Sequence, residues 1–216
     1  WSSDTFAIYI IGLLVNKNKS FKNSFSSSDI STVLADFPLP NASFNLNNAG
    51  AVKVNKTVLD EFGMGGTGTT GHTGIVLNPW DKTRICAGSS AGSACAVAAG
   101  VYQYALGTDT GDSIRKPAAY CGIVGYKPTY GMISRYGVFP YASSLDHCGV
   151  FTRSVKDAAI VVDVMKGKDE RDMTSVSTNE DFTRKIGESI DGFKVAIPDY
   201  FVSDIVDDEV KEKIFE

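Results

Sequence analysis

Two short Gly/Ser segments hold the residues whose types and spacing suggest covalent catalysis. One is GTDTGDSIR, residues 107–115, in which Ser113 follows Thr-Gly-Asp. The other is AGSSAGSA, residues 87–94. Glycines let a backbone approach a substrate closely, and consecutive N–H groups in a tight turn can stabilise an oxyanion. The pair predicts a serine nucleophile with its own oxyanion hole, although either segment alone would be read as a surface turn.

Other chemistries fit the sequence less well. Residues 66–71 match Gly-x-Gly-x-x-Gly, but Asn78 and Pro79 follow too soon for the helix that a dinucleotide site needs. No glycine cluster continues as a phosphate-binding loop, and no Gly-x-Ser-x-Gly elbow of the α/β-hydrolase kind is expected. With only His72 and His147 in the chain, no metal site is expected. His147 is interpreted as structural, so the base for a serine is expected to be a buried lysine.

The composition is that of an ordinary globular chain with room for one sizeable domain. The 216 residues are 43% hydrophobic and 21% charged, and a net charge of −4 gives no general attraction to nucleic acid. The apolar run over 6–15 is too short to cross a bilayer, so it predicts a core helix or strand and no membrane insertion. The cysteines lack CxxC spacing and predict reduced, buried thiols: Cys86, Cys95, Cys121 and Cys148.

The chain is expected to consist of two regions that differ in amino-acid composition. Residues 1–48 are expected to form an irregular N-terminal segment, because 16–48 is rich in Asn, Ser and Lys and buries little apolar surface. Residues 49–216 are expected to form one domain. Within it, the Gly/Thr run over 63–74 predicts a loop without regular structure.

The remaining patterns alternate between strand and helix, which favours an α/β fold. Residues 94–106 are small and apolar on all sides and predict a buried helix. Residues 152–169 predict an amphipathic helix that begins with a Ser154/Asp157 capping pair and stops at Gly167. Short strands are expected at two places and a last helix at the C-terminal end: 120–126, 193–197 and 207–216.

Several separated motifs together resemble the amidase signature family. The long Gly/Ser segment 88–131 is similar to the family's hallmark throughout. Other segments match motifs of the family in order and spacing: KTVLDEFGMG (56–65), NPWDKTR (78–84), KPTYGMISRYGVFPYASSLD (127–146) and KGKDERDMTS (166–175). The resemblance implies a fold with a mixed central β-sheet covered by helices on both faces. It also implies that the chain is incomplete, because 191–201 is similar to the segment that opens the second half of the family's domain.

The resemblance assigns roles to residues of both Gly/Ser segments. Ser113 corresponds to the family's nucleophile. Ser89, which lies 24 residues earlier and is held on a cis peptide in the family, would relay a proton between the nucleophile and a lysine. The oxyanion hole would consist of the backbone N–H groups of Thr110, Gly111, Asp112 and Ser113. No cofactor or metal is implied in this chain.

The chain departs from the family pattern at three positions of these segments. Asp112 stands where the family usually has glycine, and an acidic side chain there could crowd the hole or oppose a developing oxyanion. Ala87 and Ala91 also replace usual glycines, which is a milder change.

The family's catalytic lysine has no counterpart that can be assigned. Its motif should fall within about the first twenty residues, where none is found. Lys17, Lys19 and Lys22 match only in residue type, and Lys56 belongs to a motif interpreted as structural. The catalytic lysine is therefore left unassigned.

Within the family, the match points to the branch that supplies ammonia from glutamine to tRNA-dependent amidotransferases. This implies partners: a GatB-type subunit that uses ATP and Mg²⁺ to activate Glu-tRNA(Gln) or Asp-tRNA(Asn), and a small third subunit of GatC or GatF type. Aminoacyl-tRNA would be bound mainly through the partner. Two alternatives stay open, a stand-alone amidase and a catalytically inactive scaffold. The Asn/Lys/Ser-rich beginning favours the mitochondrial matrix, with bacterial cytoplasm as the alternative.

Overall fold

The computed structural model of the chain describes residues 8–12, 46 and 49–215. The chain separates into two compact units, residues 1–184 and 185–216. Within the segment expected to be irregular, Ile8–Gly12 form strand β1 and Leu46 is buried in the core. The apolar run therefore does contribute a strand, and most of the rest of 1–48 lies outside the described residues.

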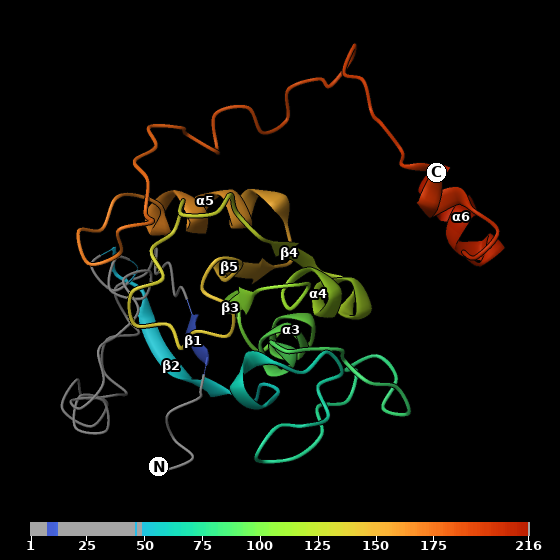
Figure 1. Cartoon of the computed structure of the whole chain (residues 1–216), viewed down its shortest axis with the longest axis horizontal. Coiled ribbons are helices and arrows are strands. Elements are labelled where there is room, and N and C mark those ends of the chain that lie inside the picture. Colours follow the sequence, from blue (N-terminus) through green and yellow to red (C-terminus); the bar gives the residue numbers. More distant parts are fainter. Residues whose placement is uncertain (1–7, 13–45, 47–48, 216) are drawn as a thin grey trace, which may run out of the picture. The chain divides into compact units, whose positions relative to one another are not determined.

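Antiparallel pairing builds the sheet that carries the Gly/Ser segments (Figure 1). Its strand order is β3-β5-β4, and the strands are β3 (Tyr104–Asp109), β5 (His147–Thr152) and β4 (Val124–Tyr126). In register, Tyr104 faces Thr152, and Asp109 faces His147. β1 pairs antiparallel with β2 (Val52–Thr57) and contacts β3. All pairings between these strands are antiparallel, so the parallel pairs of a mixed sheet are not among them.

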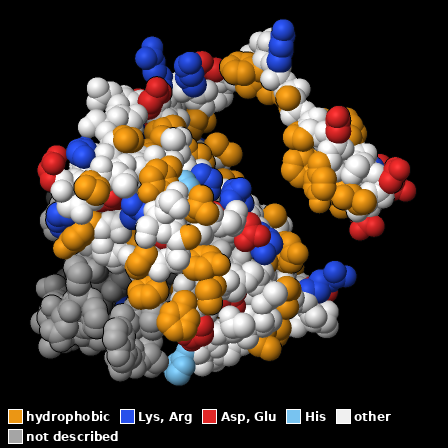
Figure 2. Space-filling view, in the orientation of Figure 1, with side chains coloured by type: hydrophobic (Ala, Val, Ile, Leu, Met, Phe, Trp, Pro, Cys, Tyr) orange, Lys and Arg blue, Asp and Glu red, His pale blue; other side chains and the backbone are white. Residues whose placement is uncertain are grey.

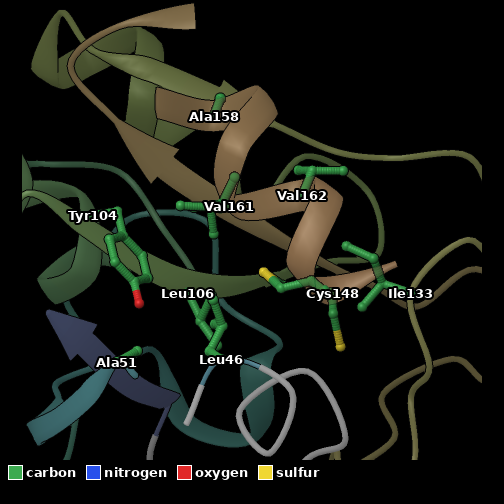
Figure 3. Packing of buried hydrophobic residues seen from close by; sticks show 11 residues of the cluster. Leu46, Ala51, Tyr104, Leu106, Ile133, Cys148, Ala158, Val161 and Val162 are labelled. Atoms are coloured by element: carbon green, nitrogen blue, oxygen red, sulfur yellow. The ribbon is translucent and has the colours of Figure 1, made fainter. Parts of the chain in front are cut away.

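Helices cover both faces of the β3-β5-β4 sheet. Alternate side chains of a strand point to opposite faces. Tyr104 and Leu106 of β3 accordingly pack toward α5 (Val155–Met165), whereas Ala105 packs toward α3 (Ala91–Ala98) and α4 (Arg115–Cys121). Figure 3 shows the α5 face of this core, with apolar side chains from the helix and from β3 and β5 in contact: Ala158, Val161, Val162, Tyr104, Leu106 and Cys148.

The helix predicted over 152–169 is confirmed as α5. Its Ser154 accepts a hydrogen bond from the backbone N–H of Asp157 at 3.1 Å, which is the expected cap. Its buried residues lie on one face: Ala158, Val161, Val162 and Met165. The last helix is also present as α6 (Asp208–Phe215), and the Gly/Thr run over 63–74 contains only the end of the short 3-10 helix η3 (Glu61–Gly63).

Other predicted elements were wrong in extent or type. The helix expected over 94–106 ends at Ala98, because Gly100 adopts a φ of +75° and the chain enters β3 at Tyr104. The strand expected at 120–126 is the end of α4 followed by β4. Residues 193–197 form no strand, since the unit over 185–215 contains no other strand with which they could pair.

The second unit, 185–216, buries little of itself. Its described elements are the 3-10 helix η4 (Asp199–Val202) and α6, and no residue between 185 and 215 is buried. Figure 2 shows hydrophobic side chains gathered on its surface. The large exposed ones are Ile186, Ile190, Phe193, Val195, Ile197, Tyr200, Phe201, Ile205, Val210, Ile214 and Phe215. Across the described ranges, no helix is long and apolar enough to cross a membrane.

Candidate active site

Ser113 lies in the turn between β3 and α4, where the chain leaves the sheet. Its side chain is buried, with 6% of the residue surface exposed. Its carbonyl oxygen accepts a hydrogen bond of 3.3 Å from the backbone N–H of Ser90. Ser90 immediately precedes α3, so this bond joins the two Gly/Ser segments that sequence analysis singled out. The fold therefore brings together the segments of Ser113 and Ser89.

Asp109, the last residue of β3, fixes the shape of the Ser113 turn. Its fully buried carboxylate accepts hydrogen bonds from the backbone N–H groups of Ile114 (3.0 Å) and Arg115 (3.3 Å). The Arg115 guanidinium adds two more, at 3.1 Å and 2.9 Å. Burial alone would raise the pKa of Asp109, but these hydrogen bonds outweigh it and hold the pKa below its usual value. Sequence analysis missed Asp109.

The backbone N–H groups expected to form the oxyanion hole are not engaged by any part of the chain that the structure describes. No hydrogen bond within the described residues uses the N–H of Thr110, Gly111, Asp112 or Ser113. A Cβ placed on Gly111 would meet nothing within 4 Å, so the turn is open on that side. The Thr110 hydroxyl donates to the buried carboxylate of Asp146 at 2.5 Å, which fixes one end of the turn. The turn therefore presents several N–H groups for an added acceptor.

The carboxylate of Asp112 is neutralised by a neighbour one helical turn later. Lys116 Nζ lies 2.8 Å from Asp112 Oδ2, and the two side chains are 31% and 50% exposed. An ion pair at this spacing is a usual pairing on a helix. Sequence analysis expected a carboxylate that could oppose an oxyanion, and the structure shows a carboxylate engaged by a lysine.

Ser89 is buried beside this turn with an unused hydroxyl. The Gly88–Ser89 peptide bond is cis, which confirms the conformation that the resemblance implied. The side chain is completely buried, and its Oγ has no hydrogen-bond partner among the residues described. Buried hydroxyls are normally paired. The hydroxyl is therefore available to a donor or acceptor from elsewhere.

Asp60 holds the Ser89 segment against the Gly/Thr loop. Its N–H donates to the Ser89 carbonyl at 3.0 Å. Its buried carboxylate accepts from the N–H groups of Thr67, Gly68 and Thr70 and from the Thr70 hydroxyl, at 2.9–3.2 Å. A Cβ on Gly88 would overlap this carboxylate, so only glycine fits there. The loop 66–71 thus supports the serine site, and its signal in the sequence was the acidic residue just before the glycines.

The two alanines that replace usual glycines sit in different backbone conformations. Ala87 has a φ of +60°, in the left-handed region that costs an L-residue about 1–2 kcal/mol. Ala91 is the first residue of α3, where alanine is favourable. The first replacement is therefore costly and the second is not.

The other candidate bases are placed as follows. The Nδ1 atom of His147 lies 2.5 Å from the Leu145 carbonyl oxygen and 3.2 Å from that of Asp109, which fits the structural role expected for it. Lys56 is exposed on β2. The remaining candidates, Lys17, Lys19 and Lys22, lie outside the described residues. The catalytic lysine therefore stays unassigned.

The comparisons with known proteins agree with this fold. The chain belongs to the amidase family, because the family model described as Amidase matches residues 34–216. It is similar to the A subunit of the glutamyl-tRNA(Gln) amidotransferase of Staphylococcus aureus (strain bovine RF122 / ET3-1), with 46% identity over 202 residues, 92% of this chain and 42% of that protein. The corresponding protein of Staphylococcus carnosus (strain TM300) is 51% identical over 170 residues, 78% of this chain and 35% of that protein.

Solved structures show the same likeness. The crystal structure of the A subunit of glutamyl-tRNA(Gln) amidotransferase from Thermotoga maritima aligns with a TM-score of 0.78 and 42% identity, over 85% of this chain and 41% of that one. A peptide amidase in complex with chymostatin aligns with a TM-score of 0.63 and 38% identity, over 67% and 31%. The predicted amidase-signature fold is confirmed. The chain spans about two fifths of the length of these amidotransferase relatives. They are bacterial, which gives no support to a mitochondrial setting.

Proposed function

We propose that this chain provides the serine site of a glutamine-hydrolysing amidotransferase subunit, with Ser113 as the nucleophile. One observation carries the proposal. The Ser113 turn presents unengaged backbone N–H groups, and a hydrogen bond ties it to the segment whose buried Ser89 hydroxyl has no described partner. Covalent catalysis by serine needs both an oxyanion hole and a route for the proton.

The reaction proceeds through an acyl-enzyme. Ser113 Oγ attacks the side-chain amide carbon of glutamine, and its proton passes to Ser89 Oγ, which gives its own proton to the unassigned lysine. The N–H groups of residues 110–113 stabilise the oxyanion. The C–N bond then breaks, and the nitrogen takes a proton and leaves as ammonia. Attack by water on the ester releases glutamate and restores Ser113.

The partners follow from the proteins that this chain resembles. Those relatives are named as subunits of a glutamyl-tRNA(Gln) amidotransferase, so a GatB-type subunit with ATP and Mg²⁺ would consume the ammonia here. A small third subunit would complete the complex. The bacterial relatives favour bacterial cytoplasm over the mitochondrial matrix as its setting.

A second candidate function is a stand-alone amidase. The likeness to a peptide amidase favours it, since that enzyme shares the fold over 67% of this chain. A stand-alone amidase would release ammonia without a partner, whereas the amidotransferase subunit would depend on its GatB-type partner. Absence of ammonia release under both conditions would instead favour the inactive scaffold.

The first experiment is labelling of the purified chain with a fluorophosphonate probe. We expect labelling that disappears in Ser113→Ala and falls at least about 100-fold in Ser89→Ala, because loss of a proton-transfer group costs roughly that much. The matched control Ser189→Ala changes an exposed serine and should label like the wild type. Labelling that persists in Ser113→Ala would contradict the assignment of the nucleophile.

A further inference from the structure

Three of the four cysteines converge between α3 and α4. The Sγ atoms of Cys86 and Cys121 lie 3.0 Å apart, and both side chains are completely buried. Cys95 packs against the same apolar cluster and lies one turn of α3 beyond Ala91, whose carbonyl oxygen accepts a hydrogen bond of 3.3 Å from the Cys86 thiol. Cys86 precedes α3, Cys95 lies within it, and Cys121 is the last residue of α4. The fold thus joins two buried thiols to a third that is only partly buried.

We propose that Cys86 and Cys121 form a reversible disulfide when the protein meets hydrogen peroxide, with Cys95 relaying the oxidation to them. Their sulfur atoms have to approach by only about 1 Å to reach the ~2.05 Å of a disulfide bond. The modification does not depend on whether Ser113 is catalytic.

Cys95 is the thiol that a peroxide can reach. It is partly exposed, whereas Cys86 and Cys121 have no exposed surface. The neighbouring Cys86 thiol outweighs burial and lowers the pKa of Cys95 to about 7. A lowered pKa increases the thiolate fraction at neutral pH, and the thiolate is the form that reacts.

The oxidation of Cys86 and Cys121 through Cys95 takes three steps. The Cys95 thiolate takes one oxygen from the peroxide and becomes a sulfenic acid, and water is released. The Cys86 thiol condenses with this sulfenic acid, which forms a Cys86–Cys95 disulfide and releases a second water. The Cys121 sulfur then attacks Cys86, and Cys95 leaves with the proton that Cys121 loses. One peroxide is reduced to two waters, and two thiols are oxidised to one disulfide.

The resulting bond would join the two segments of the serine site. Cys86 lies three residues before Ser89, and α4, which Cys121 ends, begins two residues after Ser113. The disulfide would therefore connect the chain that leads into one serine to the helix that follows the other.

The test is peroxide treatment of the whole chain, alkylation and peptide mapping without reduction. We expect a Cys86–Cys121 linked peptide that dithiothreitol removes, together with a Tm rise of roughly 5 °C or more from closing a long loop. Cys95→Ser should slow formation of this link at least about tenfold, because no accessible thiol then remains beside the pair. Cys148→Ser is the matched control, since Cys148 is buried in the other core cluster and burial raises its pKa to about 12.

Two results would overturn the proposal. Recovery of Cys86 and Cys121 in alkylated form, after Cys95 has been oxidised to a sulfinic acid, would exclude the disulfide. Formation of the link in Cys95→Ser at the wild-type rate would exclude the relay. The wild-type map alone decides the first point, so a variant that fails to fold does not leave it open.

Discussion

At the scale of single residues, the balance of charge around the Ser113 turn rests on one ion pair. Asp112 brings a carboxylate next to N–H groups suited to an oxyanion, and Lys116 engages that carboxylate at 2.8 Å. An exposed pair of this kind contributes little to folding. The pair changes the free energy of a negative charge that develops nearby by a similarly small amount. Because that charge develops in the transition state, even a small change alters the reaction rate.

Lys116→Met should therefore lower the rate of fluorophosphonate labelling by about fivefold, which corresponds to about 1 kcal/mol. The reason is that Asp112 then keeps an uncompensated charge beside the oxyanion hole. Adding Asp112→Asn to Lys116→Met should restore the rate, which a merely structural role of Lys116 would not allow. Lys211→Met removes a similar pair with Asp208 in the second unit and serves as the control. A rate that Lys116→Met leaves unchanged would show that the pair does not act on the turn.

At the scale of elements, Asp109 connects β3 to α4 through a carboxylate with no exposed surface. Its hydrogen bonds to Ile114 and Arg115 place the start of the helix and, with it, Ser113. Removing the charge leaves weaker hydrogen bonds and an unpaired Arg115 guanidinium. The Asp109 hydrogen bonds therefore stabilise the fold and also set the position of Ser113.

Asp109→Asn should lower the free energy of unfolding at pH 7 by about 2–3 kcal/mol, measured by urea denaturation. Because the folded pKa of Asp109 is lowered, its contribution is complete above the unfolded pKa near 3.9 and is lost as the pH falls through the folded pKa. The difference between wild type and variant should therefore stay constant down to about pH 5 and shrink only below about pH 4. Asp81→Asn, which removes an exposed pair with Arg84, should change little at any pH. A difference that grew on acidification would contradict this role.

Elements with a strong local signal were predictable from the sequence, and those that depend on distant partners were not. α5 was predictable because Ser154 caps it and its apolar residues recur on one face. β5 was missed, since HCGVFT becomes a strand only between β3 and β4. Its Gly149 is needed there because a Cβ would overlap the Tyr126 carbonyl.

The candidate site was predictable to a similar degree. The positions of Ser113 and Ser89 followed from the family resemblance. Asp60 and Asp109 were missed, because their role is to accept hydrogen bonds from backbone groups that only the tertiary fold brings near them. Likewise, a pattern of residue types could not show that Lys116 would engage Asp112.

At the scale of the whole molecule, the two units differ in how much they bury. The unit that contains the serine segments has apolar clusters on both faces of its β3-β5-β4 sheet. In the second unit, no residue from 185 to 215 is buried, and α6 is eight residues long. Helices shorter than about 12–15 residues are marginal in water without packing. The second unit is therefore expected to have little stability of its own in this chain.

Hydrogen–deuterium exchange should show this contrast. Amides over 185–215 should exchange fully within about a minute at neutral pH, because local opening there costs close to nothing. Amides of β5, paired on both sides, should exchange only through opening of the sheet and provide the internal control. Slow exchange in α6 comparable to that of β5 would show that the second unit is held in place by contacts.

The contacts of Asp60 limit which substitutions this part of the sequence can accept during evolution. Its carboxylate serves three backbone N–H groups and one hydroxyl, and its own N–H binds the Ser89 carbonyl. Backbone groups are common to every residue except proline, so the side chains of Thr67 and Thr69 can change without loss of these bonds, whereas Gly68 has a φ of +74° and Thr70 also donates its hydroxyl. Replacing Asp60 removes all its acceptors at once, and no single change in the loop restores them. We therefore expect lineages to keep this aspartate while positions 67 and 69 of the loop vary.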